Sequence, residues 1–367
     1  MAARSFNLKP LWQHLLGLEN MKYPDGSGRS GRVDRNFERT FPVAVVGLGR
    51  AGAFSVEALR DLRWARVVGG VDLLGDEAPA AITMSCPIFR SVSELRGSVP
   101  VDVAIVATPT ASHPGIVAEL LGAGPNRPRR VLVEKPLAAS RPGLARCAML
   151  AKRTRTDLRT LLHATFTPEV LWASRHRSSL ERRHGAIRSV RSEFSDPYRD
   201  DITIYTAKLG SAWIDSGINA LSVAARFVDL GSVMQVHGQS PLQCDAVVAI
   251  AGSPSSGSVS IRAQWSSRSR EKSTTLTFED GSRAILSHSK GELYVLTPAG
   301  AHERKLVFGR STGARRYRPM LHTYINDGPD LLSRDLEATI HDIAASVAAM
   351  NWPIDAIRLP YHNEAFN

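Results

Sequence analysis

Residues 43–52, Val-Ala-Val-Val-Gly-Leu-Gly-Arg-Ala-Gly, decide how the first half of this chain folds. An apolar, β-branched run leads into a G-x-G-x-x-G spacing, and a helix-like segment follows it. In such a strand–turn–helix unit the glycines permit a tight turn, close approach of a pyrophosphate and close packing of the helix. The N–H groups at the helix start then hold phosphates. The alternative is an ordinary strand-to-helix turn, but the flanking segments favour a dinucleotide site. Its predicted cofactor-binding residues are Gly47, Leu48, Gly49, Arg50, Ala51 and Gly52.

The next apolar run, 66–71, ends in an acidic residue, Asp72. Asp72 lies twenty residues after Gly52, near the spacing at which a carboxylate contacts the ribose hydroxyls of a dinucleotide. A carboxylate there repels a 2′-phosphate and favours NAD, whereas Arg50 inside the turn keeps NADP open. The alternative is that Asp72 only begins a loop.

Composition and charge narrow the class of protein. The 367 residues are 43% hydrophobic, which is enough for two domains with a sizeable core. The net charge is +11, but the basic residues are scattered and no basic block is interleaved with aromatic residues. We therefore predict a conventional surface without a nucleic-acid partner. Such a charge also attracts an anionic cofactor.

The sequence shows no run of membrane length, and its first forty residues contain no long hydrophobic stretch. Its cysteines, Cys86, Cys147 and Cys244, lie far apart without metal-ligand spacing. They are expected to be buried thiols in a reducing compartment. We accordingly predict a cytoplasmic protein with no membrane partner and no metal site.

The order of elements predicts an α/β protein with two domains between flanking segments. Residues 1–40 are an extension with a flexible linker at 24–31 and a candidate amphipathic helix at 11–18. Residues 41–160 alternate strands and helices, which indicates a Rossmann-type, doubly wound parallel sheet. The expected strands are 43–46, 67–71, 102–106 and 130–133, and the expected helices include 115–121 and 143–158.

The second domain, 161–350, is expected to bind substrate and to mediate oligomerisation. It reads as an α+β domain with a large, mainly antiparallel sheet, one strong helix at 216–229 and a final helix at 334–349. A tail, 351–367, follows. The expected strands are 187–194, 232–238, 245–251, 258–266, 273–278 and 283–287.

Polar motifs follow two of the parallel strands, where open α/β sheets bind ligands. Thr108, Pro109 and His113 come after the third strand, and Glu134-Lys135-Pro136 comes after the fourth. A lysine at a strand end near a bound cofactor can polarise a substrate hydroxyl or share its proton. These motifs are therefore predicted to complete the cofactor site, with Lys135 also catalytic. The added cofactor-site residues are Asp72, Thr108, Pro109, His113, Glu134 and Lys135.

Together these motifs resemble the Gfo/Idh/MocA family, which is named for glucose–fructose oxidoreductase, inositol dehydrogenase and rhizopine catabolism. The resemblance covers roughly residues 41–350 and rests on the glycine turn, Thr108-Pro109 with His113, Glu134-Lys-Pro136 and Trp213-Ile-Asp-Ser-Gly-Ile-Asn219. Many members end the last motif in a histidine with acid/base duties. The version here is similar to that of sugar 1-dehydrogenases acting on D-galactose and L-arabinose, and it implies that Glu193 contacts the sugar.

Asp215 and Asn219 are four residues apart, so they lie on one face of the expected helix. We predict that Asp215 is catalytic and that Asn219, Glu193 and His163 bind substrate. Each has a plainer reading: Asp215 as an N-cap, Asn219 as a helix amide, Glu193 as an exposed strand-end acid and His163 as a buried structural histidine. An amide cannot accept a proton at neutral pH, so the proton must go to Asp215, Lys135 or water.

The expected function is an NAD(P)-dependent oxidoreductase that oxidises a polyhydroxylated small molecule. The resemblance favours an aldose oxidised at C1 to a lactone, although Arg199 keeps a charged substrate open. One alternative is a catalytically silent sensor or regulatory protein with the same fold. Another is a reductase acting on a biosynthetic keto or imino sugar.

A period-two pattern in the second half bears on assembly. Val259, Ile261, Ala263 and Trp265 point to one side of their strand, as Val248 and Ile250 do on the preceding strand. If that side faces away from the helices, it favours a homodimer or homotetramer formed through the sheet. The alternative is that these residues are ordinary core beneath the helices.

Overall fold

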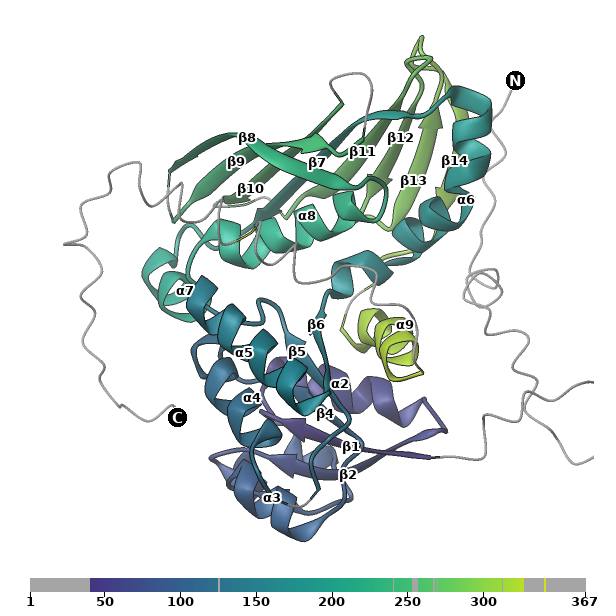
Figure 1. Ribbon diagram of the computed structural model, residues 1–367. Coiled ribbons are helices and arrows are strands. Elements are labelled where there is room, and N and C mark those ends of the chain that lie inside the picture. Colours follow the sequence, from purple (N-terminus) through teal and green to yellow (C-terminus); the bar gives the residue numbers. More distant parts are fainter. Residues whose placement is uncertain are drawn as a thin grey trace, which may run out of the picture.

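The fold comes from a computed structural model, which describes residues 40–326 except 125, 240, 253–256, 267, 269 and 312, together with residue 340. Two layered domains stand one above the other, as Figure 1 shows. The lower domain is built on a parallel sheet and the upper one on a large mixed sheet. The predicted α/β class, with a Rossmann-type sheet followed by a mainly antiparallel one, is confirmed.

The first sheet has six parallel strands in the order β3-β2-β1-β4-β5-β6. This is the strand order of a doubly wound sheet. The chain adds strands on one side of β1 and then, from β4 onward, on the other side, and such sheets bind dinucleotides at the point between β1 and β4. The strands are β1 (Phe41–Val46), β2 (Ala65–Val71), β3 (Ile88–Phe89), β4 (Val103–Val106), β5 (Arg130–Glu134) and β6 (Asp157–Leu161). The helices are α2 (Arg50–Arg60), α3 (Val92–Ser98), α4 (His113–Leu121) and α5 (Arg141–Thr154).

The central strands are apolar on both faces, as a sheet covered by helices on both sides requires. Along β1, Val43 and Val45 enter one core, while Ala44 and Val46 enter the other. The sequence prediction missed β6 because it extended the helix of 143–158 too far. Helix α5 ends at Thr154, and Arg155 adopts a left-handed conformation that turns the chain into the sixth strand.

The second sheet has eight strands in the order β14-β13-β12-β11-β7-β10-β9-β8. Only the β7–β10 pair is parallel, and the other neighbouring strands run antiparallel. The strands are β7 (Ile187–Asp196), β8 (Leu230–Gln239), β9 (Gln243–Ile250), β10 (Ser258–Trp265), β11 (Lys272–Phe278), β12 (Arg283–Ser287), β13 (Glu292–Leu296) and β14 (His302–Val307).

Helices in the second half are more numerous than the sequence suggested. The predicted helix of 216–229 is a π-helical turn, Trp213–Gly217, that continues into α8 (Ile218–Ala225). The prediction missed α6 (Pro168–His184) and α7 (Ile202–Leu209). Helix α6 carries mostly charged side chains between its few buried residues, so its apolar stripe is narrow and its periodicity is weak.

The period-two residues of β10 form the core beneath the helices. Val259, Ile261 and Ala263 are almost fully buried and belong to one apolar cluster with residues of α8. Trp265, at the end of the same strand, is also buried. The opposite face of the sheet carries charged side chains such as Arg262. The apolar outer face considered from the sequence is therefore not formed by these residues, and the predicted oligomer loses that support.

The last described helix, α9 (Ala314–Ile325), packs on the first domain although it follows the second in sequence. It lies against α2, beside the lower sheet in Figure 1. Arg130 at the start of β5 donates to the carbonyl oxygens of Tyr324 and Ile325, the latter at 2.7 Å. Leu161, where the second domain was predicted to begin, is the last residue of β6, and the chain returns to the first domain after the second sheet. Residues 1–39, the predicted tail and most of the predicted helix of 334–349 lie outside the described residues.

Candidate active site

The glycine turn joins β1 to α2 at the point where the strand order reverses. Gly47 has φ +90°, and a Cβ there would lie 2.7 Å from the backbone of Ala107. A Cβ on Gly52 would lie 2.0 Å from the carbonyl oxygen of Gly47, so both positions require glycine. Around Gly49, by contrast, a Cβ would meet nothing within 4 Å. The turn therefore leaves open space in front of its middle glycine.

The open space suits a phosphate group. Helix α2 has no acidic residue in its first turn and no side-chain cap at Gly49, so its first N–H groups are available to an anion. At the end of β2, the Asp72 carboxylate accepts hydrogen bonds from the backbone N–H of Leu48 at 2.8 Å and of Leu74 at 3.0 Å. The residues present thus fit a dinucleotide, with a carboxylate beside the turn.

His113 clamps the two loops that follow β4 and β5. Its Nε2 lies 2.8 Å from the Thr108 carbonyl oxygen, and its Nδ1 lies 3.0 Å from that of Pro136. Burial lowers the pKa of His113, while hydrogen bonds to these carbonyls raise it in part. The side chain is completely buried, so its predicted contact with the cofactor is replaced by a role in holding both loops. Thr108 lies in the clamped loop and bonds Ser112.

Lys135 and Asp215 meet across the boundary between the two domains. The Lys135 Nζ lies 2.6 Å from Asp215 Oδ1 and donates to the Asp215 carbonyl oxygen at 2.9 Å. Both side chains are 13% exposed. Burial alone would lower the pKa of Lys135, but the Asp215 charge and hydrogen bond outweigh it and raise that pKa above its usual value. Lys135 is therefore a fixed cation at the end of β5.

Asp215 sits inside the π-helical turn rather than at a helix N-cap. Single π turns inside helices are frequent at functional sites. Asn219, one turn later, donates its Nδ2 to the Asp215 carbonyl oxygen at 3.1 Å. Its Oδ1 is buried and has no hydrogen-bond partner. The turn thus supplies a carboxylate, and the first turn of α8 supplies an amide oxygen without a partner.

His163 lies where the chain leaves the first domain. Its ring stacks on Tyr317 of α9 with centroids 5.6 Å apart. Burial lowers its pKa well below the usual value, and the positive charges of Arg316, Lys135 and Lys272 lower it further. The imidazole is therefore neutral at pH 7. Its Nδ1 is buried without a hydrogen-bond partner.

Glu193 is not brought to this group. It lies on the charged outer face of the sheet, 2.8 Å from Arg191 and 3.8 Å from Arg262. Its side chain is 36% exposed. Successive strand residues alternate between faces, so the neighbouring core side of β7 carries Phe194 and Asp196 instead. The predicted sugar contact of Glu193 is therefore corrected to its position on the far face.

Asp196 is the acidic residue that sequence reasoning missed. It is 4% exposed and accepts hydrogen bonds from Ser216 at 2.6 Å and from Lys272 at 2.8 Å. Burial raises its pKa, but the charge and hydrogen bond of Lys272 and the hydrogen bond of Ser216 bring that pKa below its usual value. The alternation of Phe194 and Asp196 along β7 was the signal that could have found it.

Tyr317 is the second missed residue, because α9 was not predicted. Its hydroxyl donates to Glu134 Oε1 at 2.7 Å. Burial raises the pKa of Glu134, and burial together with the Glu134 charge raises that of Tyr317. Glu134 is 7% exposed and lies directly before Lys135. It therefore anchors the loop that carries Lys135 to α9.

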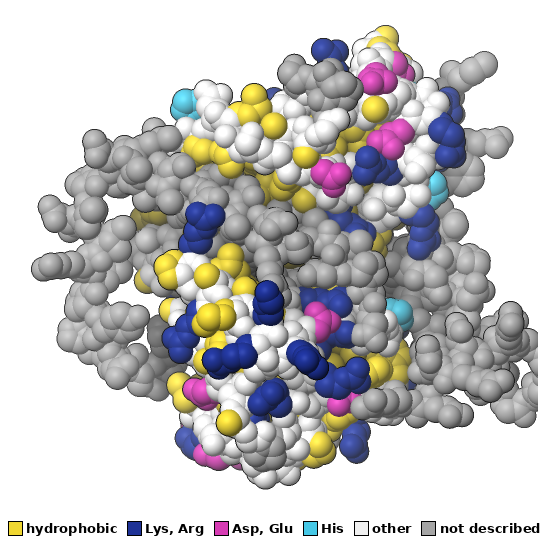
Figure 2. All heavy atoms as spheres, viewed as in Figure 1, with side chains coloured by type: hydrophobic (Ala, Val, Ile, Leu, Met, Phe, Trp, Pro, Cys, Tyr) yellow, Lys and Arg dark blue, Asp and Glu magenta, His cyan; other side chains and the backbone are white. Residues whose placement is uncertain are grey.

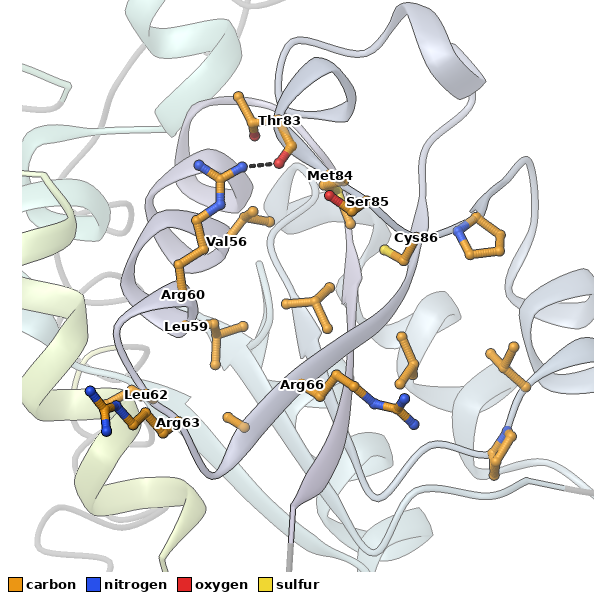
Figure 3. Close-up of a pocket in the computed structure, with 16 residues that line it drawn as sticks. Val56, Leu59, Arg60, Leu62, Arg63, Arg66, Thr83, Met84, Ser85 and Cys86 are labelled. Atoms are coloured by element: carbon orange, nitrogen blue, oxygen red, sulfur yellow. Dashed lines mark hydrogen bonds between the residues drawn. The ribbon is translucent and has the colours of Figure 1, made fainter. Parts of the chain in front are cut away.

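Two cavities lie outside this group. One, of about 620 Å³, lies beside the amino-terminal half of β2 and the carboxyl-terminal half of α2, away from the carboxyl ends of the strands. Figure 3 shows Arg60 at its rim, donating to the carbonyl oxygen of Thr83. Most of its lining is apolar, including Val56 and Leu59.

Comparison with known proteins bears on the glycine turn first. Residues 41–160 match the Gfo/Idh/MocA family, described as an oxidoreductase family with an NAD-binding Rossmann fold. No curated protein matches the chain.

Solved structures share the fold of most of the chain. UDP-N-acetylglucosamine 3-dehydrogenase GnnA from Acidithiobacillus ferrooxidans is 16% identical, with a TM-score of 0.68 over 84% of this chain and 98% of that one. GenD2 from gentamicin A biosynthesis, in complex with NAD, is 18% identical. Its TM-score is 0.67, over 87% of this chain and 96% of the GenD2 chain. A putative myo-inositol dehydrogenase from Sinorhizobium meliloti 1021 is 16% identical. Its TM-score is 0.66, over 84% of this chain and 97% of the dehydrogenase chain. At these identities the likeness shows the fold alone.

The predictions about membrane spans, metal sites and surface charge concern the rest of the described residues. Among the described residues, no helix is long and apolar enough to cross a membrane, and no cluster of three metal-binding side chains occurs. Figure 2 shows Lys and Arg side chains on both domains with acidic side chains among them. The absence of a nucleic-acid partner, the cytoplasmic location and the closeness to galactose and arabinose dehydrogenases stay predictions.

Proposed function

We propose that the chain is an NAD(P)-dependent dehydrogenase that acts on a CH–OH group of a polyhydroxylated small molecule, with an aldose oxidised at C1 to a lactone as the first candidate. The observation that carries the proposal is the 2.6 Å contact between Lys135 and Asp215. It joins the carboxyl end of β5, on the nucleotide side, to the π-helical turn of the second domain. Two proteins of similar structure, the UDP-N-acetylglucosamine 3-dehydrogenase and the putative myo-inositol dehydrogenase, support this substrate class.

Each residue of the group has a separate task in this proposal. Lys135 holds its positive charge, so it donates a hydrogen bond to the substrate oxygen and stabilises negative charge developing there. Asp215 accepts the hydroxyl proton, because its carboxylate already lies within hydrogen-bond distance of the same ammonium group. Loss of this proton and of a hydride from the carbon leaves a carbonyl group. Bound NAD(P) supplies the hydride acceptor.

The buried groups without hydrogen-bond partners give the proposed site its preference for ligands that carry hydroxyl groups. Asn219 Oδ1 and His163 Nδ1 are both buried without partners, which costs free energy until a ligand satisfies them. An amide oxygen accepts a hydrogen bond from a hydroxyl, and a neutral imidazole nitrogen accepts or donates one. Two such groups near a lysine–carboxylate pair favour a ligand with several hydroxyls over one with a single alcohol.

The proposal is tested by the absorbance of reduced nicotinamide with purified protein. Aldoses, polyols and inositols are offered with NAD and with NADP, and the corresponding lactones and ketoses are offered with the reduced cofactors to cover the reverse direction. We expect turnover with at least one polyhydroxylated compound. Lys135→Met should then reduce kcat on the order of 10²- to 10⁴-fold while the Kd of the cofactor stays within about twofold.

Lys290→Met is the matched control, since Lys290 is an exposed residue of the turn between β12 and β13. It should keep full activity. Cofactor binding without turnover on any compound would support the silent sensor instead. Equal losses of cofactor affinity and kcat in Lys135→Met would contradict the role assigned to Lys135.

A further inference from the structure

A cavity of about 590 Å³ lies between α2, α6 and α9, and none of its described lining residues belongs to the proposed active site. Its volume falls in the range of small-molecule pockets. One wall is apolar, with Leu62, Phe166 and Leu171. The remaining wall is strongly charged. Its charged lining residues are Arg175, Arg226, Arg315 and Arg318 against Glu57 and Asp61.

Arg226 is the unusual member of this wall. It is partly buried at the end of α8 and lies over the ring of Phe166, 6.0 Å from its centroid. Within the part of the chain that the structure describes, its guanidinium group makes no hydrogen bond and no ion pair. Its Nε atom is buried without a partner. A guanidinium group has five N–H donors, so leaving them unsatisfied away from water is costly.

Two neighbours repeat this pattern. The Nε of Arg318 and the Nε2 of His322 are also buried without partners, although Arg318 Nη1 reaches Asp61 Oδ2 at 3.2 Å. Burial and the nearby Arg318 lower the pKa of His322, so its imidazole is neutral at pH 7. The charged lining residues are thus four arginines and only two carboxylates, and three of the lining residues, Arg226, Arg318 and His322, each have a buried nitrogen atom without a partner.

We propose that this cavity binds a small metabolite through an oxyanion, a phosphate or carboxylate group, held by Arg226. A planar guanidinium offers two parallel N–H donors that match such a group. The apolar wall beside Phe166 receives the rest of the ligand. Since the lining comes from helices that pack on both sheets, the bound anion also ties the two domains together. The inference is independent of the redox function proposed above.

The test is calorimetric titration of the full chain, saturated with NAD so that the glycine turn does not take up the probe. Inorganic phosphate and citrate are the two probes, and they distinguish a phosphate ligand from a carboxylate ligand. We expect one of them to bind in a single saturable event. Arg226→Gln should weaken that binding at least tenfold. The variant keeps much of the side-chain shape but loses the positive charge and the two parallel N–H donors of the guanidinium group.

Arg188→Gln is the matched control, since Arg188 is exposed on β7 and lies outside the cavity. It should bind the probe as the wild type does. Equal affinity in Arg226→Gln and wild type, or no saturable binding of either probe, would overturn the proposal. A purely structural role in stacking on Phe166 predicts a different result: Arg226→Gln would lower the melting temperature and leave anion affinity unchanged.

Discussion

At the scale of single residues, the glycine turn separates a position needed for folding from one needed for binding. Gly52 has no room for a Cβ, whereas Gly49 has φ −70° and ψ −160°, which any residue adopts, and open space in front of it. We predict that Gly49→Ala keeps the melting temperature of the wild type but weakens NAD binding on the order of tenfold, because the methyl group occupies the approach of the pyrophosphate.

Gly52→Ala provides the contrast. A Cβ 2.0 Å from the Gly47 carbonyl oxygen forces α2 away from β1, so we expect a loss of about 1–3 kcal/mol in unfolding free energy. Denaturant unfolding and isothermal titration of both variants separate the two effects. If Gly49→Ala is as unstable as Gly52→Ala, the open space assigned to the cofactor has been misjudged.

Asp196 gives a pH-dependent prediction. Its folded pKa lies below its usual value of about 4, so its contribution to stability is present above that value and is lost as the pH falls through the folded pKa. Asp196→Asn removes the contribution and leaves Lys272 without its carboxylate. We expect a loss of about 2 kcal/mol at pH 7 and a smaller difference from wild type at about pH 3.

Urea unfolding at several pH values measures this difference. Asp245→Asn serves as the control, because its ion pair with Arg262 is on the exposed face and contributes under about 1 kcal/mol. A constant difference between Asp196→Asn and wild type from pH 7 to about pH 3 would show that the charge of Asp196 is not what stabilises this region.

At the scale of elements, sequence patterns predicted those parts whose periodicity is strong. The buried run of β1 and the glycine turn after it fixed the Rossmann half, and the turn was found with its residues in place. The loop lysine and Asp215 could be grouped because both follow recognisable motifs. Glu193 was misplaced because the motif comparison ignored the alternation along β7, which sends Glu193 and Asp196 to opposite faces.

Helix α9 could not be predicted in the same way. Its helix interior contains Pro319, and its partners lie almost two hundred residues earlier in the chain, as the contact between Arg130 and Ile325 shows. Tertiary packing therefore decides this element, and local propensity does not. Only that packing brings Tyr317 into contact with Glu134.

Tyr317→Phe tests whether α9 anchors the catalytic loop. The change leaves the buried Glu134 carboxylate short of one donor, so we expect a loss of about 1–3 kcal/mol in unfolding free energy. The pKa of Glu134, already raised by burial, should rise further. Tyr294→Phe is matched to it, since Tyr294 also donates to a glutamate, Glu292, but on the more exposed β13. Equal stability losses in the two variants would remove the anchoring role.

At the scale of the whole molecule, three links bind the two domains into one unit. The Lys135–Asp215 pair joins the loop after β5 to the π-helical turn of the second domain, His163 stacks on Tyr317, and α9 returns from the second domain to the first. A ligand that binds only to the folded state stabilises every part that unfolds with its site. Cofactor binding to the glycine turn should therefore protect strands of the second sheet that do not touch the turn.

We predict that NAD at one hundred times its Kd raises the free energy of opening by about 2.7 kcal/mol in both domains. Hydrogen exchange followed by mass spectrometry measures this separately in β4 and in β10, the buried centres of the two sheets. Arg130→Gln removes the donor that holds the carbonyl oxygens of Tyr324 and Ile325, so it should weaken the link through α9. In that variant the cofactor should still slow exchange in β4, while its effect on β10 should shrink. If β10 exchanges at the same rate with and without NAD in the wild type, the domains open independently, and the lysine–carboxylate pair does not connect them energetically.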